Sequence, residues 1–130
     1  MPRPALLVAE REPLQALSTR KLVLETAKFN VLTAHSTQEA LDLYRLFPHI
    51  SMAVLAMDEA IDCAQIAGII GKASNPRIPI IGLSPRESEL CSFADHTLSS
   101  FDPESLVQLA RALLGDPRQI DAKNGFPPAS

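Results

Sequence analysis

The sequence predicts an α/β domain with a doubly wound, five-stranded parallel sheet. Short apolar runs alternate along the chain with amphipathic segments of helical periodicity. Apolar residues make up 46% of the chain, but with one Tyr, five Phe and no Trp the core must be aliphatic, as in buried parallel strands. A chain of 130 residues is long enough for one domain with a substantial core. These observations together favour a flavodoxin-like strand order.

The expected strands are short apolar runs, of which the fifth is the weakest. They are predicted at 5–10, 30–35, 51–57, 78–83 and 95–99.

The expected helices follow the strands and carry recognisable start and stop signals. Ser36 and Glu39 form a capping box, and Asp102 is the expected N-cap of the last helix, which Gly115 ends. The helices are predicted at 13–28, 36–47, 61–73 and 102–115. The buried face of the second is expected to hold Ala40, Leu41, Leu43, Tyr44 and Phe47.

The fourth helix of the fold is expected to be shortened to a stub or a loop. Only nine residues, 85–93, separate Ser84 from Ala94, too few for a full-length helix with two connections. From Asp116 onward Pro, Gly and polar residues predict a flexible tail. The domain is therefore expected to span 1–115, with 116–130 as the tail.

Composition excludes several classes of partner and location. The formal net charge of −3 leaves no electrostatic footprint for nucleic acid or an anionic membrane. The apolar stretch 5–9 is too short for a signal peptide or a membrane span. Cys63 and Cys91 belong to no CxxC pair or disulfide framework, so reduced core thiols are expected. These features predict a soluble cytoplasmic domain.

In open parallel sheets the functional site lies at the carboxyl ends of the strands. The third strand, in "ISMAVLAMDEA", ends in Leu55, Ala56 and Met57, which carry no reactive group. The residues expected at this edge are Glu10, Arg11, Ala56 to Glu59, Ser84, Ser99 and Ser100.

Three stretches resemble the receiver domains of response regulators. "LLVAEREP" is similar to their first strand and acidic turn, and "IPIIGLSP" to their fourth strand, which ends in a hydroxyl residue. "FADHTLSSFDPESLVQLARALL" resembles their fifth strand and last helix. The resemblance covers residues 5 to about 115. It implies Mg²⁺ held by first-strand acids, an Asp nucleophile ending the third strand, and a hydroxyl and a Lys for the phosphoryl oxygens.

Most of this implied site is missing here. Glu10 matches the first acid and Ser84 the hydroxyl, but Arg11 replaces the second acid and Ala56 the phosphoacceptor. Ser99 or Ser100 stands in place of the Lys. The residual acids nearby are Glu12 and Asp58. No metal site or cofactor is expected, because the Arg11 charge competes with Mg²⁺ for Glu10.

The resemblance implies a degenerate receiver, not an enzyme, acting as a phosphorylation-independent interaction module in signal transduction. Its partner would be a protein (a kinase, a regulator or an effector domain), and a homodimer is compatible with this interpretation. One alternative is a phosphoryl-accepting receiver of a two-component system that uses Asp58 after a shift of the third strand. The other is an α/β domain that senses a small ligand, although no Gly-rich phosphate loop supports it.

Plainer explanations exist for the same residues. Glu10, Arg11 and Asp58 are explained equally by a loop ion pair. Ser84 before Pro85 is a typical start of a turn. The scattered histidines, His35, His49 and His96, are not expected to bind a metal.

Overall fold

The computed structural model describes residues 4–11, 19–86, 90–100 and 102–117. Its centre is one five-stranded sheet with the order β2-β1-β3-β4-β5, in which all neighbouring strands are parallel. The strands are β1 Ala5–Ala9, β2 Asn30–Ala34, β3 Met52–Ala56, β4 Ile80–Ser84 and β5 His96–Ser99. The predicted doubly wound, flavodoxin-like topology is confirmed.

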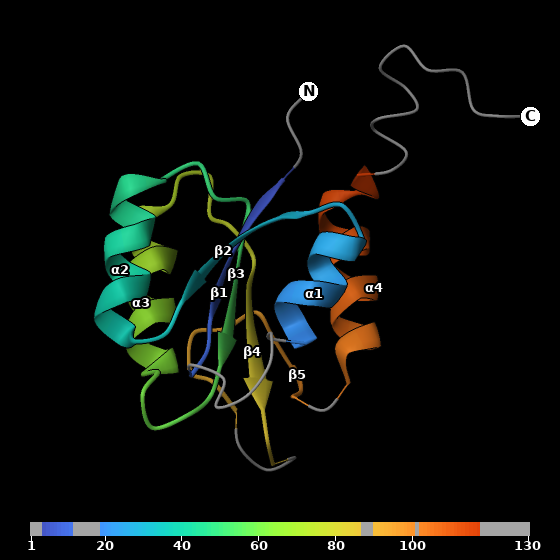
Figure 1. The fold of residues 1–130 in the computed structure, drawn as a ribbon. Helices are drawn as coiled ribbons and strands as arrows, with labels where there is room; N and C mark the ends of the chain where they lie inside the picture. The colour runs from blue at the N-terminus through green and yellow to red at the C-terminus, as the bar shows by residue number, and fades with distance from the viewer. Residues whose placement is uncertain (1–3, 12–18, 87–89, 101, 118–130) are drawn as a thin grey trace, which may run out of the picture.

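Four helices cover the two faces of this sheet within the described residues. They are α1 Thr19–Thr26, α2 Thr37–Leu46, α3 Cys63–Ala73 and α4 Pro103–Leu114. Figure 1 shows α2 and α3 on one face and α1 and α4 on the other. Strand residues alternate between the faces, so that Leu7 packs with α2 and α3 whereas Leu6 packs with α1 and α4. None of these helices has the length and apolar character needed to cross a bilayer.

The predicted capping signals are present. The Ser36 side chain accepts a hydrogen bond from the Glu39 backbone N–H at 3.1 Å, and Asp102 accepts one from the Ser105 N–H at 3.0 Å. Phe47, however, is 48% exposed, so its expected burial was wrong. It is the C-cap of α2, and with φ −128° it has left the helical stripe that buries Ala40. The predicted start of the first helix at Pro13 lies outside the described residues.

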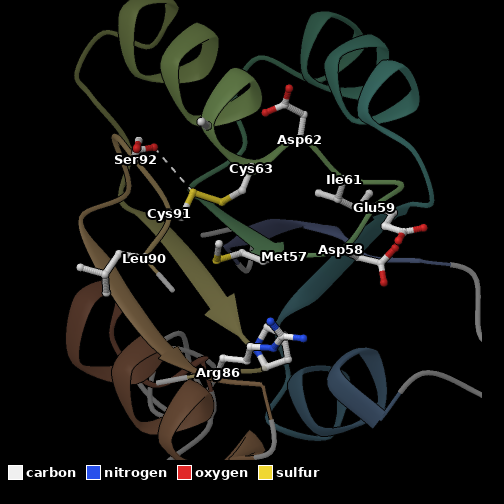
Figure 2. A pocket seen from close by; sticks show the side chains of 12 residues that line it. Met57, Asp58, Glu59, Ile61, Asp62, Cys63, Arg86, Leu90, Cys91 and Ser92 are labelled. Carbon is white, nitrogen blue, oxygen red and sulfur yellow. Dashed lines mark hydrogen bonds between the residues drawn. A yellow bond between two sulfur atoms is a disulfide. The ribbon is translucent and has the colours of Figure 1, made fainter. Parts of the chain in front are cut away.

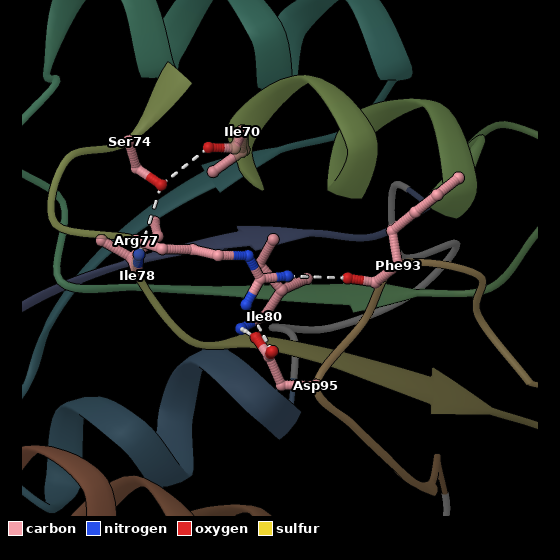
Figure 3. A network of polar contacts seen from close by, with 7 residues as sticks. All are labelled: Ile70, Ser74, Arg77, Ile78, Ile80, Phe93 and Asp95. Carbon is pink, nitrogen blue, oxygen red and sulfur yellow. Dashed lines mark hydrogen bonds and ion pairs between the residues drawn. The ribbon is translucent and has the colours of Figure 1, made fainter. Parts of the chain in front are cut away.

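The connection from β4 to β5 has no helix among its described residues, 85, 86 and 90–95, as the shortened fourth helix predicts. Polar contacts anchor its end (Figure 3). Asp95 Oδ2 accepts the Ile80 N–H at 2.7 Å, while Oδ1 binds Arg77 Nη1. Arg77 Nη2 also donates to the Phe93 carbonyl at 3.0 Å. This network fixes the start of β5 without a covering helix.

The two cysteines form a disulfide, so the expectation of reduced thiols was wrong. Cys63 is the first residue of α3 and Cys91 lies in the β4–β5 connection, with 5.9 Å between their Cα atoms. The 28-residue separation gave no sign of this proximity. It arises because α3 and the connection cover the same face of the sheet.

Candidate functional site

The carboxyl edge of the sheet brings Glu10 and Ala56 to the same level. Ala9, the last residue of β1, pairs with Leu55 of β3. The residue after each is therefore at the same level: Glu10, which follows β1, and Ala56, which ends β3. Glu10 is 2% exposed and Ala56 is 7% exposed. The position at the end of β3 is therefore enclosed, and its side chain is a methyl group.

The carboxylate of Glu10 is held by a residue of α1. Arg20 Nη1 lies 2.8 Å from Glu10 Oε2. The backbone of Glu10 is also fixed, since its N–H donates to the Ala34 carbonyl at 2.9 Å and its carbonyl lies 3.1 Å from His35 Nδ1. Glu10 Oε1 and Arg20 Nε have no hydrogen-bond partner among the described residues. The pair is buried on the carboxylate side and reaches solvent through Arg20, which is 27% exposed.

The serines expected at this edge do lie together. Ser84 pairs with Ser99 across β4 and β5, and the Ser100 N–H donates to the Ser84 carbonyl at 2.9 Å. The Ser84 hydroxyl is engaged within its own turn: it accepts the Arg86 N–H at 3.1 Å and donates to the Arg86 carbonyl. The turn-forming interpretation of Ser84 is thus confirmed.

The charged residues expected near the site are spread apart. Arg11 is exposed, and Glu12 lies outside the described residues. Asp58 lies two residues beyond the end of β3, where its Oδ1 accepts the Ala60 N–H at 3.0 Å. Glu10 forms its ion pair with Arg20 of α1, not with the loop residue Arg11 that the sequence suggested.

An open cleft of about 680 Å³ lies beside this edge, between the loop after β3 and the β4–β5 connection. Its charged lining residues are Asp58, Glu59, Asp62 and Arg86 (Figure 2). Both cysteines of the disulfide also line it, with Met57 and Leu90 supplying apolar surface. Neither Glu10 nor Ser84 lines this cleft.

The residues present do not fit the Mg²⁺ ion that the receiver resemblance implies. Mg²⁺ requires several oxygen ligands in near-octahedral geometry. Here one Glu10 oxygen is bound by a guanidinium, and the end of β3 supplies no side-chain oxygen. Within the described residues no cluster of three or more His, Cys, Asp or Glu is arranged to hold a metal.

The sequence alone did not predict Arg20, whose guanidinium binds the buried Glu10 carboxylate at this edge. A signal was present, because Arg20 falls at helical spacing between Leu17 and Leu24 in an otherwise apolar stripe. A cation in such a stripe lies on the face that packs against the sheet. Arg86 in the cleft was missed as well, and it had no comparable signal.

No protein-family model matches the sequence, and comparison with curated proteins finds no match. Solved structures do match. A response regulator receiver domain from Clostridium thermocellum superposes with a TM-score of 0.73 at 20% identity, covering 90% of this chain and 98% of that one. The response regulator TrrA from Thermotoga maritima, solved in complex with Mg²⁺-BeF, gives 0.66 at 26% identity, covering 85% and 99%.

A third similar structure is CheY6 from R. sphaeroides, solved in complex with the phosphorylated P1 domain of CheA3. It gives a TM-score of 0.60 at 21% identity and covers 85% of this chain and 96% of that one. The chain therefore has the fold of response-regulator receiver domains over most of its length. At these identities the likeness concerns the fold, and the function has to be argued from the residues at the edge of the sheet.

Proposed function

We propose that this domain is a receiver-like module of signal transduction that binds a protein partner without being phosphorylated. The observation that carries the proposal is Ala56. It ends β3, lies level with Glu10, and has no oxygen with which to attack phosphorus. A receiver fold with this substitution lacks the group that would be modified, and a partner would meet a surface reshaped at the β4–β5 connection, which has no helix among its described residues.

The charges around position 56 support the same conclusion. Phosphoryl transfer depends on positioning and on neutralising negative charge, usually with a metal ion and a cationic side chain. Here Glu10, the one acid buried among the described residues, is neutralised by Arg20, and Ser99 ends β5. No lysine lines the cleft among the described residues. Arg20 thus supplies at Glu10 the positive charge that a metal ion would otherwise supply.

The partner class follows from the fold and from the charge of the chain. CheY6 was solved in complex with another protein domain, the P1 domain of CheA3, so the fold accommodates a protein partner. A net charge of −3 does not favour nucleic acid. The partner is accordingly a kinase, a regulator or an effector domain, encountered in the cytoplasm.

Asp58 is the alternative phosphoacceptor, because it lies in the loop that follows β3 and lines the cleft. Its Oδ1 accepts the Ala60 N–H at 3.0 Å and so stabilises the turn that leads into α3. This bond fixes the carboxylate in the turn, so that only Oδ2 is left to attack, two residues beyond the end of β3. The geometry therefore favours a structural role for Asp58.

Incubation with Mg²⁺ and acetyl phosphate, followed by intact-mass spectrometry, tests the proposal. The expected mass is unchanged, while a receiver domain with an intact acidic site gains a phosphoryl group under the same conditions. An adduct that is lost in Asp58→Asn would contradict the proposal and establish the alternative. An adduct that persists in Asp58→Asn would contradict both.

A further inference from the structure

The Cys63–Cys91 disulfide joins two elements that the sheet topology leaves separate. Cys63 opens α3, and Cys91 lies in the connection that takes the place of a fourth helix. Figure 2 shows the bond between the first turn of α3 and the segment that carries Leu90 and Ser92. Both cysteines are 6% exposed, and both contribute to the wall of the cleft. A small thiol entering the cleft therefore reaches the neighbourhood of the bond.

The two halves of the segment 90–95 are held in different ways. The second half is anchored by Asp95, which binds Ile80 and Arg77, and by the Phe93 carbonyl, which accepts from Arg77. For residues 90–92, no hydrogen bond among the described residues reaches α3 or β4. Leu90 is 72% exposed and contributes little burial. The disulfide is thus the principal tie of the first half.

Cys91 occupies a close-fitting position on β4. A Cβ added to Gly82 would lie 2.7 Å from the Cys91 Cβ, so the absence of a side chain at position 82 makes the contact feasible. Phe93, two residues further along the segment, has φ +70°, a conformation that costs energy for a bulky residue. Release of Cys91 would remove the packing on Gly82 and permit Phe93 to relax. The closed arrangement depends on the covalent bond.

We propose that this disulfide is a thiol–disulfide exchange site that acts as a redox-controlled clamp on residues 90–92. A dithiol is the reductant: one of its thiolates attacks a cysteine sulfur, and the other cysteine leaves as a thiolate and is protonated. The second thiol of the reductant then displaces the first cysteine and closes a disulfide within the reductant. Two electrons and two protons reach Cys63 and Cys91, and the dithiol is oxidised.

Reduction has a local consequence in this structure. Residues 90–92 leave β4 and the first turn of α3, whereas Asp95 keeps the start of β5 in place. The surface uncovered belongs to the apolar cluster that contains Ile66 and Ile80. In a reducing compartment the open form is the resting state, because intracellular disulfides are usually transient and redox-sensing. The clamp does not depend on the proposed function.

Thiol alkylation and amide exchange test the clamp on the intact chain. Protein purified without reductant is expected to add no alkyl group, and to add two after dithiothreitol in native buffer. Reduction should raise amide exchange at Ala94, whose N–H donates to the Cys91 carbonyl at 3.3 Å, by about tenfold or more while β1 and β3 keep their protection. The Tm should fall by roughly 10 °C, since the bond closes a loop that spans a 28-residue separation.

The variant Cys63→Ala/Cys91→Ala is the matched control, because it keeps the Cβ of residue 91 that packs over Gly82. Its Ala94 amide should exchange rapidly with or without dithiothreitol. Two alkyl groups added before any reductant would overturn the clamp by showing that no bond forms. Reduction only after unfolding in urea, unchanged exchange at Ala94, or loss of protection in β1 on reduction would each show a structural bond instead of a switch.

Discussion

Arg20 Nη1 lies 2.8 Å from Glu10 Oε2, so a side chain of α1 supplies the positive charge at the edge of the sheet. Glu10 is 2% exposed, and burying a carboxylate is costly unless a counter-charge or hydrogen bonds compensate. The guanidinium provides both and occupies an oxygen that a metal would require. The pair explains how Glu10 stays buried in a chain that lacks the second acid of the metal site.

Arg20→Met should lower the free energy of unfolding by about 3 kcal/mol, because it leaves Glu10 buried without its partner. Urea denaturation at neutral pH measures the change. Lys21→Met is the matched control: Lys21 is exposed and 3.9 Å from Glu25, and its loss should cost less than about 0.5 kcal/mol. The double variant Arg20→Met/Glu10→Gln should regain part of the loss.

Mg²⁺ provides a second measurement on the same variants. The wild-type Tm should not respond to Mg²⁺, because Arg20 already neutralises Glu10. A rise in the wild-type Tm that disappears in Glu10→Gln would show that the metal binds at Glu10 after all. Equal destabilisation by Arg20→Met and Lys21→Met would show that the pair contributes nothing specific.

Gly82→Ala should destabilise the oxidised protein by about 1–3 kcal/mol, because the new Cβ would lie 2.7 Å from the Cys91 Cβ. Cys91 cannot move away freely while it is bonded to Cys63. This destabilisation should be smaller after reduction with dithiothreitol. Thermal or urea denaturation of the wild type and the variant, each oxidised and reduced, measures the difference.

Gly68→Ala is the control for that substitution. Its Cβ would meet Phe93 Cδ2 at 3.7 Å, an ordinary contact, and Ala is favoured over Gly inside a helix by about 0.5–1 kcal/mol. We expect Gly68→Ala to be neutral or stabilising. An equal cost for Gly82→Ala in the oxidised and reduced proteins would mean that Cys91 stays on β4 in both.

Protonation of Asp102 is expected to lower the stability of the protein in acid. The Ser105 hydroxyl and backbone N–H both donate to its carboxylate, and these bonds hold the pKa of Asp102 below its ordinary value of 3.8. A lowered pKa in the folded state means that the stabilisation is complete above the unfolded value and is lost as the pH falls through the folded one. This stabilisation is therefore lost at pH values below about 4.

Asp102→Asn keeps an acceptor at the N-cap but does not titrate at this position. Comparing the Tm of the two proteins at neutral pH and in acid isolates the contribution of Asp102. The wild type should be the more stable at neutral pH, and the difference should narrow in acid. A constant difference across the range would remove Asp102 from the acid response.

The elements of the fold were predictable because each depends on local sequence. The alternation of apolar runs with helical stripes yields the β/α order, and Ser36 and Asp102 mark helix starts through bonds that span three residues. Phe47 shows the limit of this reasoning. Its spacing suits the buried stripe of α2, but the helix ends one residue earlier and the side chain turns outward.

The residues of the edge were predictable as a set, whereas their partners were not. Parallel strands bring Glu10, Ala56 and Ser84 to one edge, so strand ends suffice to find them. The pairs Arg20–Glu10 and Cys63–Cys91 depend on how helices and a connection pack on the sheet. Those contacts join elements far apart in the chain; the helical spacing of Arg20 places it on the face that packs against the sheet but does not identify its partner, and nothing local pairs Cys63 with Cys91.

Ala56→Asp should not restore phosphorylation, even though it supplies the missing nucleophile. The new carboxylate would lie level with Glu10, whose own carboxylate is already bound by the Arg20 guanidinium. It would add a second negative charge at this edge without a metal ion to neutralise it. Losing one electrostatic stabiliser typically costs about 10²–10³ in rate, and here one of the two metal acids and the lysine are missing.

Intact-mass spectrometry after incubation with Mg²⁺ and acetyl phosphate checks this, with circular dichroism to establish that Ala56→Asp is folded. The variant Arg11→Asp/Ala56→Asp/Ser100→Lys, or its Ser99→Lys counterpart, should recover Mg²⁺ binding, seen as a Tm that rises with Mg²⁺. Adding Arg20→Met to it should strengthen the binding, because Glu10 then becomes free to take the metal as ligand. Phosphorylation of Ala56→Asp alone at the rate of an intact receiver would refute the electrostatic argument, and with it the role assigned to Arg20.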